Sequence, residues 1–533
     1  MSDSNRRLRA AILAGLAIGA LLAGCHRREP SVSAASLQVL RVSQRNEPAT
    51  LDPQLATLPD EFFVLRALSE GLVTPAPDGH GVKPGAAEKW ELSADGLTWT
   101  FHLRAGAHWS NGDPVTARDF LYSFRRVLTP ALAAPKAQLF FAVKNARAFY
   151  YGELADFAAV GFAAPDDRTL VITLGHPAPH LLALAASGPW LPVHSATLEK
   201  PRGTAWTRPG NFVGNGPFTL AVWHPNQQIV VRKNPAYWDA AAVRLAEIRF
   251  VAMDNGESEE RAFRARQLDV TLSVPATKLA AYRLAKPAVL RQIPLAETRC
   301  LALNTRRAPL GDPRVRRALA LVIDRPALVE KVLLGGQSPA LNFIPPGLAG
   351  YVGGGEQVTG DHAEARRLLA EAGYPDGRGF PRLEVSTWVN SAVLEAIQQM
   401  WRQELGLEVA LVQREARVHL AALNAGDYAI AFLPAIPDYN DASDLFEDLA
   451  TGASANYPGW SNPDYDRLVA EAGRTTDAAR RQELYQRAEH ILLTELPIVP
   501  LYFNVQNFLI QSNVREWRQD GLWTRFYQPV YLE

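Results

Sequence analysis

The chain has 533 residues, of which 47% are hydrophobic, and it carries 55 basic and 55 acidic residues. This length predicts more than one domain, with enough apolar side chains for several cores. A formal charge of zero excludes the strongly basic surface that nucleic acids bind, so we expect no nucleic-acid partner. Two cysteines, Cys25 and Cys300, are too few for a disulfide framework, and Cys300 is expected to be a small buried side chain.

The N-terminus carries the features of a bacterial export signal. Three arginines within residues 6–9 precede an uncharged apolar run over 10–23, which is short for a membrane span. The run ends in Leu22-Ala-Gly-Cys25, which resembles the lipobox of bacterial lipoproteins. This resemblance implies removal of the signal peptide, residues 1–24, and a membrane anchor on acylated Cys25, with residues 25–36 as lipidated N-terminus and tether. An ordinary signal peptide with a chance cysteine is the alternative.

The stretch 90–128 predicts a strand, a turn and a helix in succession. Residues 98–103 alternate apolar and polar side chains, which is typical of a half-buried strand. Residues 111–114, Asn-Gly-Asp-Pro, then supply turn residues. Thr116 with Asp119 three residues later matches a capping box and predicts that a helix begins there.

Strands and helices alternate along the remaining chain, which favours an α/β fold. In the first half we expect strands at 37–42, 169–174, 229–233, 247–251 and 268–272, and a helix rich in Phe140, Phe141, Phe149 and Tyr150. In the second half we expect strands at 301–304, 384–388, 429–433 and 498–507, and helices at 312–325, 363–372 and 391–405. Residues 463–496 are expected to be mostly helical.

Several segments together resemble the family 5 solute-binding proteins, the periplasmic receptors of peptide ABC transporters. These segments are 46–53, Glu70-Gly-Leu72, 90–128, 229–239 and 312–325. The resemblance implies a class II periplasmic-binding-protein-like α/β fold, with two lobes, a two-strand hinge and an additional inserted domain. It implies the following boundaries: lobe I at 37–70, 196–298 and 506–533, inserted domain II at 71–195, and lobe III at 299–505.

The same resemblance implies a receptor that performs no chemistry on its ligand and needs no cofactor. We expect a monomer that captures oligopeptides between its lobes and delivers them to the permease subunits of an ABC transporter. The sequence has no Gly-x-Ser-x-Gly, His-Glu-x-x-His or P-loop motif. In His176-Pro-Ala-Pro-His180 the prolines prevent the helix that would bring both rings together, so no metal site is expected.

Other ligands and another class of protein remain open. The same fold would also serve for a murein peptide, haem, a nickel chelate or a sugar. A different class is an anchored cell-wall interaction protein or a secreted hydrolase.

Asp438 is the first candidate for a ligand contact. It follows the apolar strand predicted at 429–433, and clefts of α/β sheets form at strand ends. By resemblance to the oligopeptide-binding members, Asp438 matches the carboxylate that receives the α-ammonium of a peptide. Loss of such a counter-charge would cost about 2–5 kcal/mol. A turn cap is the alternative, because Asp438-Tyr-Asn-Asp441 is also a good turn.

The further candidates for peptide contacts are Pro434, Ile436, Tyr439, Arg307 and Tyr502. Arg307 matches a basic position of the family, and a solvated loop residue is its alternative. Tyr502 belongs to a core or to the wall of a cleft, and the sequence leaves both open. Two positions depart from the family: Ala435 stands where Trp is frequent, and Phe432 where some members carry Arg. The contact for the peptide's carboxyl end and the preferred peptide length therefore stay open.

Overall fold

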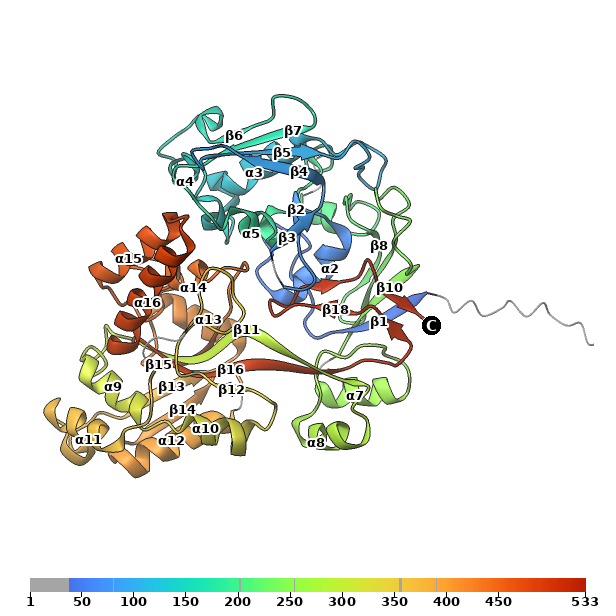
Figure 1. The fold of residues 1–533 in the computed structure, drawn as a ribbon. Helices are drawn as coiled ribbons and strands as arrows, with labels where there is room; N and C mark the ends of the chain where they lie inside the picture. Colours follow the sequence, from blue (N-terminus) through green and yellow to red (C-terminus); the bar gives the residue numbers. More distant parts are fainter. Residues whose placement is uncertain (1–37, 80, 201–202, 254, 354–356, 390) are drawn as a thin grey trace, which may run out of the picture.

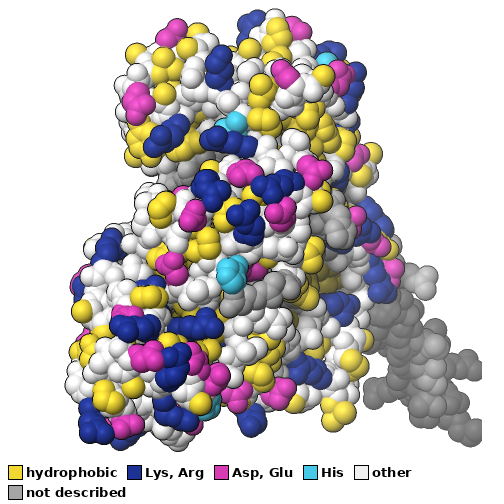
Figure 2. Space-filling view, turned by 60° about the vertical axis from the view of Figure 1, so that its left-hand side comes forward, with side chains coloured by type: hydrophobic (Ala, Val, Ile, Leu, Met, Phe, Trp, Pro, Cys, Tyr) yellow, Lys and Arg dark blue, Asp and Glu magenta, His cyan; other side chains and the backbone are white. Residues whose placement is uncertain are grey.

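The computed structural model describes residues 38–79, 81–200, 203–253, 255–353, 357–389 and 391–533. The described part contains a six-stranded sheet and two four-stranded sheets, each packed with helices (Figure 1). The predicted signal peptide and Cys25 lie outside the described residues. Among the residues described, no helix combines the length and apolar character needed to cross a membrane. Basic and acidic side chains are interspersed over the face drawn in Figure 2, in line with the balanced composition.

Lobe I is built on the sheet β1-β10-β9-β8. Its strands are β1 (Val39–Gln44), β8 (Phe218–His224), β9 (Gln228–Lys233) and β10 (Glu247–Ala252). β1 pairs parallel with β10, and the other pairs are antiparallel. Helix α2 (Pro59–Leu68) buries Phe63, Val64 and Leu65 in the core of this lobe. Helices α7 (Gly256–Arg264) and α8 (Ala276–Ala285) complete it.

The inserted domain is built on the sheet β4-β5-β7-β6. Its strands are β4 (Ala87–Leu92), β5 (Thr98–Leu103), β6 (Phe162–Ala163) and β7 (Thr169–Thr173). The strand and capped helix expected from the sequence are confirmed as β5 and α3 (Ala117–Leu128). The Thr116 N–H donates to Asp119 Oδ2 at 2.8 Å, as a capping box requires. Phe124 of α3 packs against Phe140, Phe162 and Trp190, with ring centroids 4.8–5.5 Å apart.

The single helix expected around residues 140–150 is wrong. The structure has a 3-10 turn at Ala137–Phe140 and a short helix α4 at Ala146–Tyr150. Between them Val143 forms a β-bridge with Leu174, and Asn145 has a left-handed φ of 63°. Pairing with the residue that follows β7 therefore overrides the local helical pattern.

Lobe III is built on the sheet β12-β16-β11-β15-β13-β14. Its strands are β11 (Leu290–Leu303), β12 (Ser338–Pro339), β13 (Leu383–Thr387), β14 (Val409–Gln413), β15 (Ile430–Ala435) and β16 (Ile498–Leu509). Its helices include α9 (Pro313–Leu321), α11 (His362–Glu371), α12 (Ala392–Leu405), α13 (Ala416–Ala425), α15 (Pro463–Arg474) and α16 (Ala478–Glu495). They confirm the helices expected at 363–372 and 391–405. The helix expected at 312–325 ends at Leu321, and the region 463–496 holds two helices. Cys300 on β11 is fully buried, as expected.

The remaining α-helices and strands are short. They are β2 (Val73–Pro75), β3 (Val82–Pro84), α5 (Leu181–Ala185), α6 (Ser195–Leu198), α10 (Arg325–Ala327), α14 (Ser443–Glu447), β17 (Val514–Arg515), β18 (Arg518–Gln519), β19 (Arg525–Phe526) and β20 (Tyr531–Leu532).

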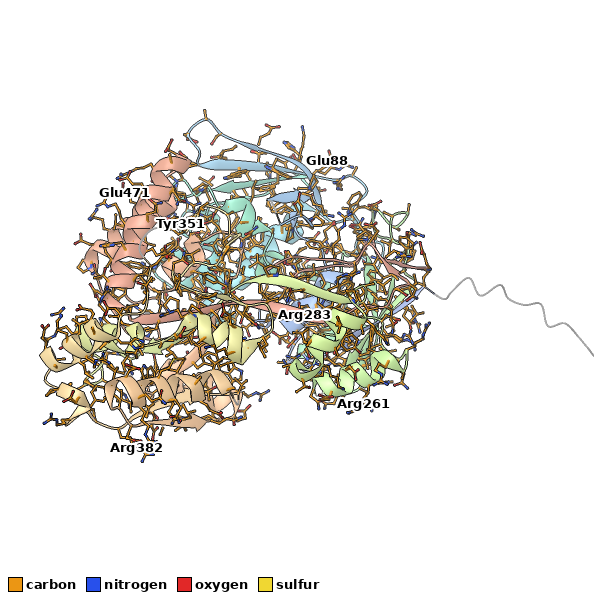
Figure 3. The ribbon with its side chains drawn as sticks, turned by 60° about the horizontal axis from the view of Figure 1, so that its bottom comes forward. Glu88, Arg261, Arg283, Tyr351, Arg382 and Glu471 are labelled. Carbon is orange, nitrogen blue, oxygen red and sulfur yellow. The ribbon has the colours of Figure 1, made fainter. Side chains whose placement is uncertain are left out.

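Strands β11 and β16 form the hinge. They pair antiparallel from Leu290–Leu509 beside lobe I to Ala302–Ile498 within the lobe III sheet, with a register shift between Pro294 and Thr298. The expected strand at 301–304 is therefore only the lobe III end of a much longer strand. In Figure 3 the labelled Arg382 of lobe III lies at the lower left and the labelled Arg261 of lobe I at the lower right, with the strand pair running across the picture above them.

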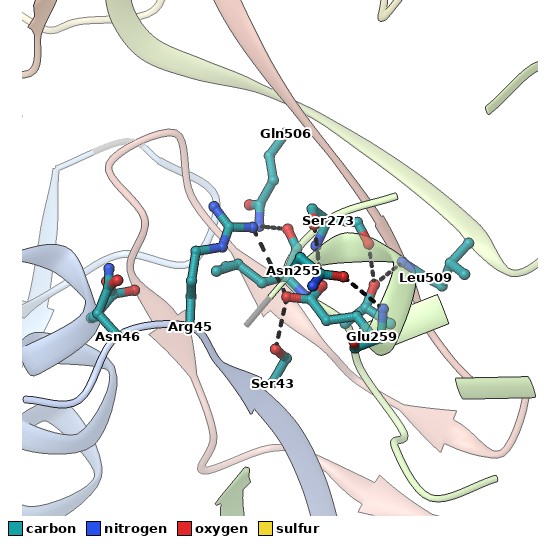
Figure 4. Close-up of polar contacts among 12 residues, drawn as sticks. Ser43, Arg45, Asn46, Asn255, Glu259, Ser273, Gln506 and Leu509 are labelled. Carbon is teal, nitrogen blue, oxygen red and sulfur yellow. Dashed lines mark hydrogen bonds and ion pairs between the residues drawn. The ribbon is translucent and has the colours of Figure 1, made fainter. Parts of the chain in front are cut away.

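A buried carboxylate attaches lobe I to the hinge (Figure 4). Glu259 of α7 accepts hydrogen bonds from Ser43 Oγ at 3.0 Å and from the N–H groups of Leu272 and Ser273 at 2.9 and 2.7 Å. The Leu272 carbonyl accepts from Gln506 on β16 at 2.9 Å. The strand expected at 268–272 is reduced to bridges at Val270, which pairs with Val42 of β1 and with Ile510 after β16. At Leu272 the side chains of Glu259 and Gln506 take the backbone groups instead.

Hydrogen bonds between Glu70 and Asn215 join the segment where the chain leaves lobe I for the inserted domain to the segment where it returns to lobe I. We call this pair of residues the Asn215 clamp. The Glu70 N–H donates to Asn215 Oδ1 at 2.9 Å, and Asn215 Nδ2 donates back to the Glu70 carbonyl at 2.8 Å. A Cβ on Gly214 would lie 2.1 Å from the Leu68 carbonyl oxygen, so only glycine fits there. The clamp fixes where the inserted domain is attached. The boundary expected at residue 71 directly follows Glu70, and the one expected at residue 195 lies before Asn215 in the chain; both stay predictions.

Candidate functional site

A cavity of about 480 Å³ lies where lobe I, the inserted domain and lobe III meet. Lobe I contributes residues 56–59 and Trp523, the inserted domain contributes Lys136 and His180, and lobe III contributes residues 436–441. Most of the wall is apolar, with a few charged side chains at defined places. This combination is typical of a site for an organic ligand.

The lobe I wall of the cavity is a loop held by one buried carboxylate. Glu61 of α2 accepts hydrogen bonds from the N–H groups of Ala49 and Thr50 at 3.2 and 3.3 Å. Its second oxygen accepts from Thr57 and Leu58 at 2.8 and 3.0 Å. Four backbone donors that would otherwise need water are thereby fixed, and the wall residues Thr57 and Leu58 with them.

The same loop is tied to the inserted domain by an ion pair. Asp52 is 2% exposed, and its carboxylate receives Arg126 Nη2 at 2.6 Å and Nη1 at 3.1 Å. Arg126 also donates to Gln54 Oε1 at 2.5 Å. Because the pair is bidentate and largely buried, it fixes the orientation of α3 against the loop.

The lobe III wall begins where β15 ends. Asp438 lies three residues beyond Ala435, and its N–H donates to Asp444 Oδ2 at 2.5 Å. Its carboxylate already has a cationic partner: Lys136 Nζ of the inserted domain lies 2.7 Å from Asp438 Oδ2. The two side chains are 27% and 28% exposed, so the pair is partly shielded from water. This ion pair joins the inserted domain to lobe III across the cavity.

Several acidic groups surround the pair. Burial raises the pKa of Asp444 well above its ordinary value and the pKa of Asp448 to about 7, and the charge of Asp438 adds to both shifts. Burial, with the charge of Asp441, also raises the pKa of Glu447 to about 7. Burial opposes the charge of Lys136, but the neighbouring carboxylate of Asp438 outweighs it and raises the pKa of the ammonium. Asp438 is thus the carboxylate in direct contact with Lys136, and Asp444 and Asp448 lie further from the ammonium.

Asp441 closes the turn that begins at Asp438. Its oxygens receive Arg481 Nη2 at 2.6 Å and Nη1 at 2.9 Å, and each of the two side chains is 6% exposed. Asp441 also accepts from the Ser443 N–H at 2.9 Å. Between these two acids, Tyr439 donates to or accepts from Ser443 Oγ at 2.9 Å and stacks on His180 of the inserted domain. Burial lowers the pKa of His180 to about 4, so this ring is neutral.

Arg66 is a second cation at the cavity. It lies on α2 and donates from Nη2 to the Ala186 carbonyl at 3.0 Å. Burial lowers the pKa of its guanidinium, and the charge of Asp520 partly opposes that shift. Within the described ranges no carboxylate forms an ion pair with Arg66.

The structure brings together some of the residues predicted from the sequence. Asp438, Tyr439 and Ile436 line the cavity. Pro434 lies within β15, paired with Arg299, and is not part of the lining.

Two further predicted residues lie elsewhere. Arg307 is on the surface and pairs with Asp427 at 2.9 Å. Tyr502 is 7% exposed and packs in the core of lobe III. Its position is therefore that of a core residue and not of a cleft wall. The sequence reasoning missed Lys136, Arg66 and Glu61. Lys136 is separated from Asp438 by 302 residues, and no local pattern marks the pair.

Comparisons with known proteins agree with this architecture. The family model of bacterial extracellular solute-binding proteins, family 5, matches residues 81–457. The probable deoxycholate-binding periplasmic protein YgiS of Escherichia coli is 35% identical, over 88% of this chain and 88% of that protein.

Solved structures extend the likeness to the fold. The murein tripeptide binding protein MppA of Escherichia coli has a TM-score of 0.85 at 32% identity, covering 93% of this chain and 99% of that chain. Its unliganded open form has a lower TM-score of 0.74. Haemophilus influenzae OppA in complex with RPPGFSPFR has a TM-score of 0.83 at 31% identity, with 93% and 99% covered.

Proposed function

Because the chain belongs to the bacterial extracellular solute-binding proteins of family 5, we propose that it captures oligopeptides in the periplasm for an ABC transporter. The peptide lies in the cavity of about 480 Å³ between the lobes, with its amino end beside Asp438. The observation that carries this proposal is the convergence of all three parts of the molecule on that cavity. The receptor performs no chemistry on the peptide and works as a monomer.

Capture follows from the hinge. Rotation about β11 and β16 moves lobe I and the inserted domain together, because the Asn215 clamp and the Asp52–Arg126 ion pair join them. Closure of this unit on lobe III excludes bulk water from the peptide. The closed form then presents its outer surface to the permease. A peptide held mainly through its backbone, with water in the side-chain spaces, would be bound with little sequence preference.

The receptor is further proposed to be a lipoprotein anchored through Cys25. The lipobox resemblance at residues 22–25 supports this proposal. Cys25→Ser should release the protein from the membrane or stall removal of its signal peptide. Radiolabelled palmitate should enter the wild type and not the variant. Equal labelling of both proteins would contradict the lipid anchor.

A thermal-shift experiment tests peptide capture. A ligand that binds only the folded state stabilises it by about 2.7 kcal/mol at a hundredfold excess over Kd. We therefore expect members of a library of peptides two to five residues long to raise the Tm by several degrees. Small-angle scattering with the same peptides should show compaction. A flat response to the library, beside a shift with haem or a nickel chelate, would contradict peptide capture.

A second candidate ligand is an amphipathic carboxylate, because the relative YgiS is named as probably deoxycholate-binding. Arg66 favours it, since this cation lies at a mostly apolar cavity and forms no ion pair among the described residues, with only the charge of Asp520 acting on it from the cavity wall. Deoxycholate is therefore included in the thermal-shift series. A shift with deoxycholate and none with peptides would move the assignment to this class.

A further inference from the structure

The Lys136–Asp438 ion pair fills the place that the sequence analysis gave to the ligand's α-ammonium. Lys136 Nζ lies 2.7 Å from Asp438 Oδ2, at the distance expected of a charge-assisted hydrogen bond. Lys136 and Asp438 both line the cavity, so the ion pair borders the ligand site. The chain itself thus supplies a primary ammonium to the carboxylate at the amino end of the ligand.

The local charges leave no counter-ion for a second ammonium. Asp444 and Asp448 lie near Asp438 but are not part of the described cavity lining, and burial raises the pKa of both carboxyl groups. Asp441 is the next carboxylate along the cavity wall, and Arg481 neutralises it through two hydrogen bonds. An ammonium entering beside Asp438 would therefore share one carboxylate with Lys136, and two like charges would lie side by side.

A ligand ammonium that displaces Lys136 from Asp438 is no more favourable than one that shares Asp438 with it. Besides Asp438 and Asp441, the described lining of the cavity includes one more carboxylate, Asp520. Asp520 already accepts hydrogen bonds from the N–H groups of Leu522 and Thr524, and the charge of Arg66 acts on it. A displaced Lys136 ammonium would thus lose its ion pair and face mainly apolar wall, which costs free energy.

We propose that Lys136 determines ligand specificity by remaining on Asp438 when the ligand binds, so that the receptor selects peptides whose amino end is acylated and uncharged. An N-acyl amide at this end has no charge to compensate, and its oxygen can accept a hydrogen bond from the Lys136 ammonium. The pair then also holds the inserted domain against lobe III in the closed receptor. This inference rests on the proposed capture of peptides and adds the chemistry of the amino end.

The test compares two tripeptide libraries, one with free amino ends and the same library N-acetylated, on the full chain. The wild type should bind the best acetylated tripeptide about tenfold or more tighter than its free counterpart, measured by titration calorimetry. Lys136→Met keeps the length of the side chain and removes its charge. It leaves Asp438 unpaired, so this variant should reverse the preference and bind the free tripeptide more tightly.

Two controls separate specificity from general damage. Lys89→Met removes an exposed lysine of the same domain, and it should keep the wild-type preference. The double variant Lys136→Met/Asp438→Asn removes both charges and should bind the two tripeptides about equally. The Tm of each unliganded variant shows whether it is folded.

The outcomes distinguish the role of Lys136 from peptide capture itself. A wild type that prefers free amino ends, or a Lys136→Met variant that is folded and keeps the wild-type preference, would overturn the role of Lys136 and leave peptide capture standing. If neither library binds to any of the folded proteins, peptide capture itself fails, and this inference fails with it.

Discussion

An Arg481→Met variant is expected to unfold with a free energy about 3–5 kcal/mol below that of the wild type. Arg481 of α16 forms two hydrogen bonds to Asp441, at 2.6 and 2.9 Å, and both side chains are 6% exposed. Methionine replaces the apolar stem and leaves the Asp441 carboxylate buried without its cation. Denaturation with urea, followed by circular dichroism, gives the change in free energy.

The neighbouring residue on the same helix provides a matched control. Arg480 pairs with Glu471 and Glu483 on the surface, with 42% of its side chain exposed. Arg480→Met should therefore change the free energy of unfolding by about 1 kcal/mol or less. The double variant Asp441→Asn/Arg481→Met should be more stable than Arg481→Met, because the buried charge is gone. If Arg481→Met is no less stable than Arg480→Met, the pair does not hold the turn 438–441 in place.

The sequence predicted the parts of the fold that depend on local patterns. The capping box at Thr116 and Asp119 gave the start of α3, and the alternation over residues 98–103 gave β5 with both bounds. Local signals sufficed here because the burial of alternate residues and the capping of the first turn depend on near neighbours.

The resemblance to the family pointed to segments whose physical role only the structure explains. Glu70 meets the segment 229–239: it accepts hydrogen bonds from Tyr237 Oη at 2.6 Å and from Trp238 Nε1 at 2.8 Å. Burial raises the pKa of Glu70 to about 7. The segments 70–72 and 229–239, which both carry the resemblance, are thus joined by buried hydrogen bonds beside the attachment of the inserted domain.

The sequence-based predictions failed where contacts between residues far apart in the chain override the local sequence pattern. Residues 268–272 have the composition of a strand, but they pair only through bridges at Val270, and Glu259 and Gln506 bind the backbone of Leu272. The Lys136–Asp438 pair spans 302 residues of sequence. A lysine within residues 134–138 looks like any surface lysine until the fold places it over the cavity.

The second large effect is expected from Glu61→Ala. The four backbone donors that Glu61 holds would lose a charged acceptor, and each such bond contributes about 1.5–3 kcal/mol where water does not replace it. Water reaches part of this loop, so we expect a net loss of about 2–4 kcal/mol in the free energy of unfolding. Because Thr57 and Leu58 form the cavity wall, ligand affinity should fall about tenfold or more as well.

Glu61→Gln separates the charge of Glu61 from its shape. The amide keeps one acceptor oxygen, so it can hold one pair of N–H groups, while its NH₂ group faces the other pair. Its loss of stability should therefore lie between those of the wild type and Glu61→Ala. Affinity for the best peptide of the library should follow the same order, because an ordered wall needs no further ordering when the ligand binds. Loss of stability without loss of affinity would show that the ligand does not touch this loop, and would place its contacts on the lobe III side of the cavity alone.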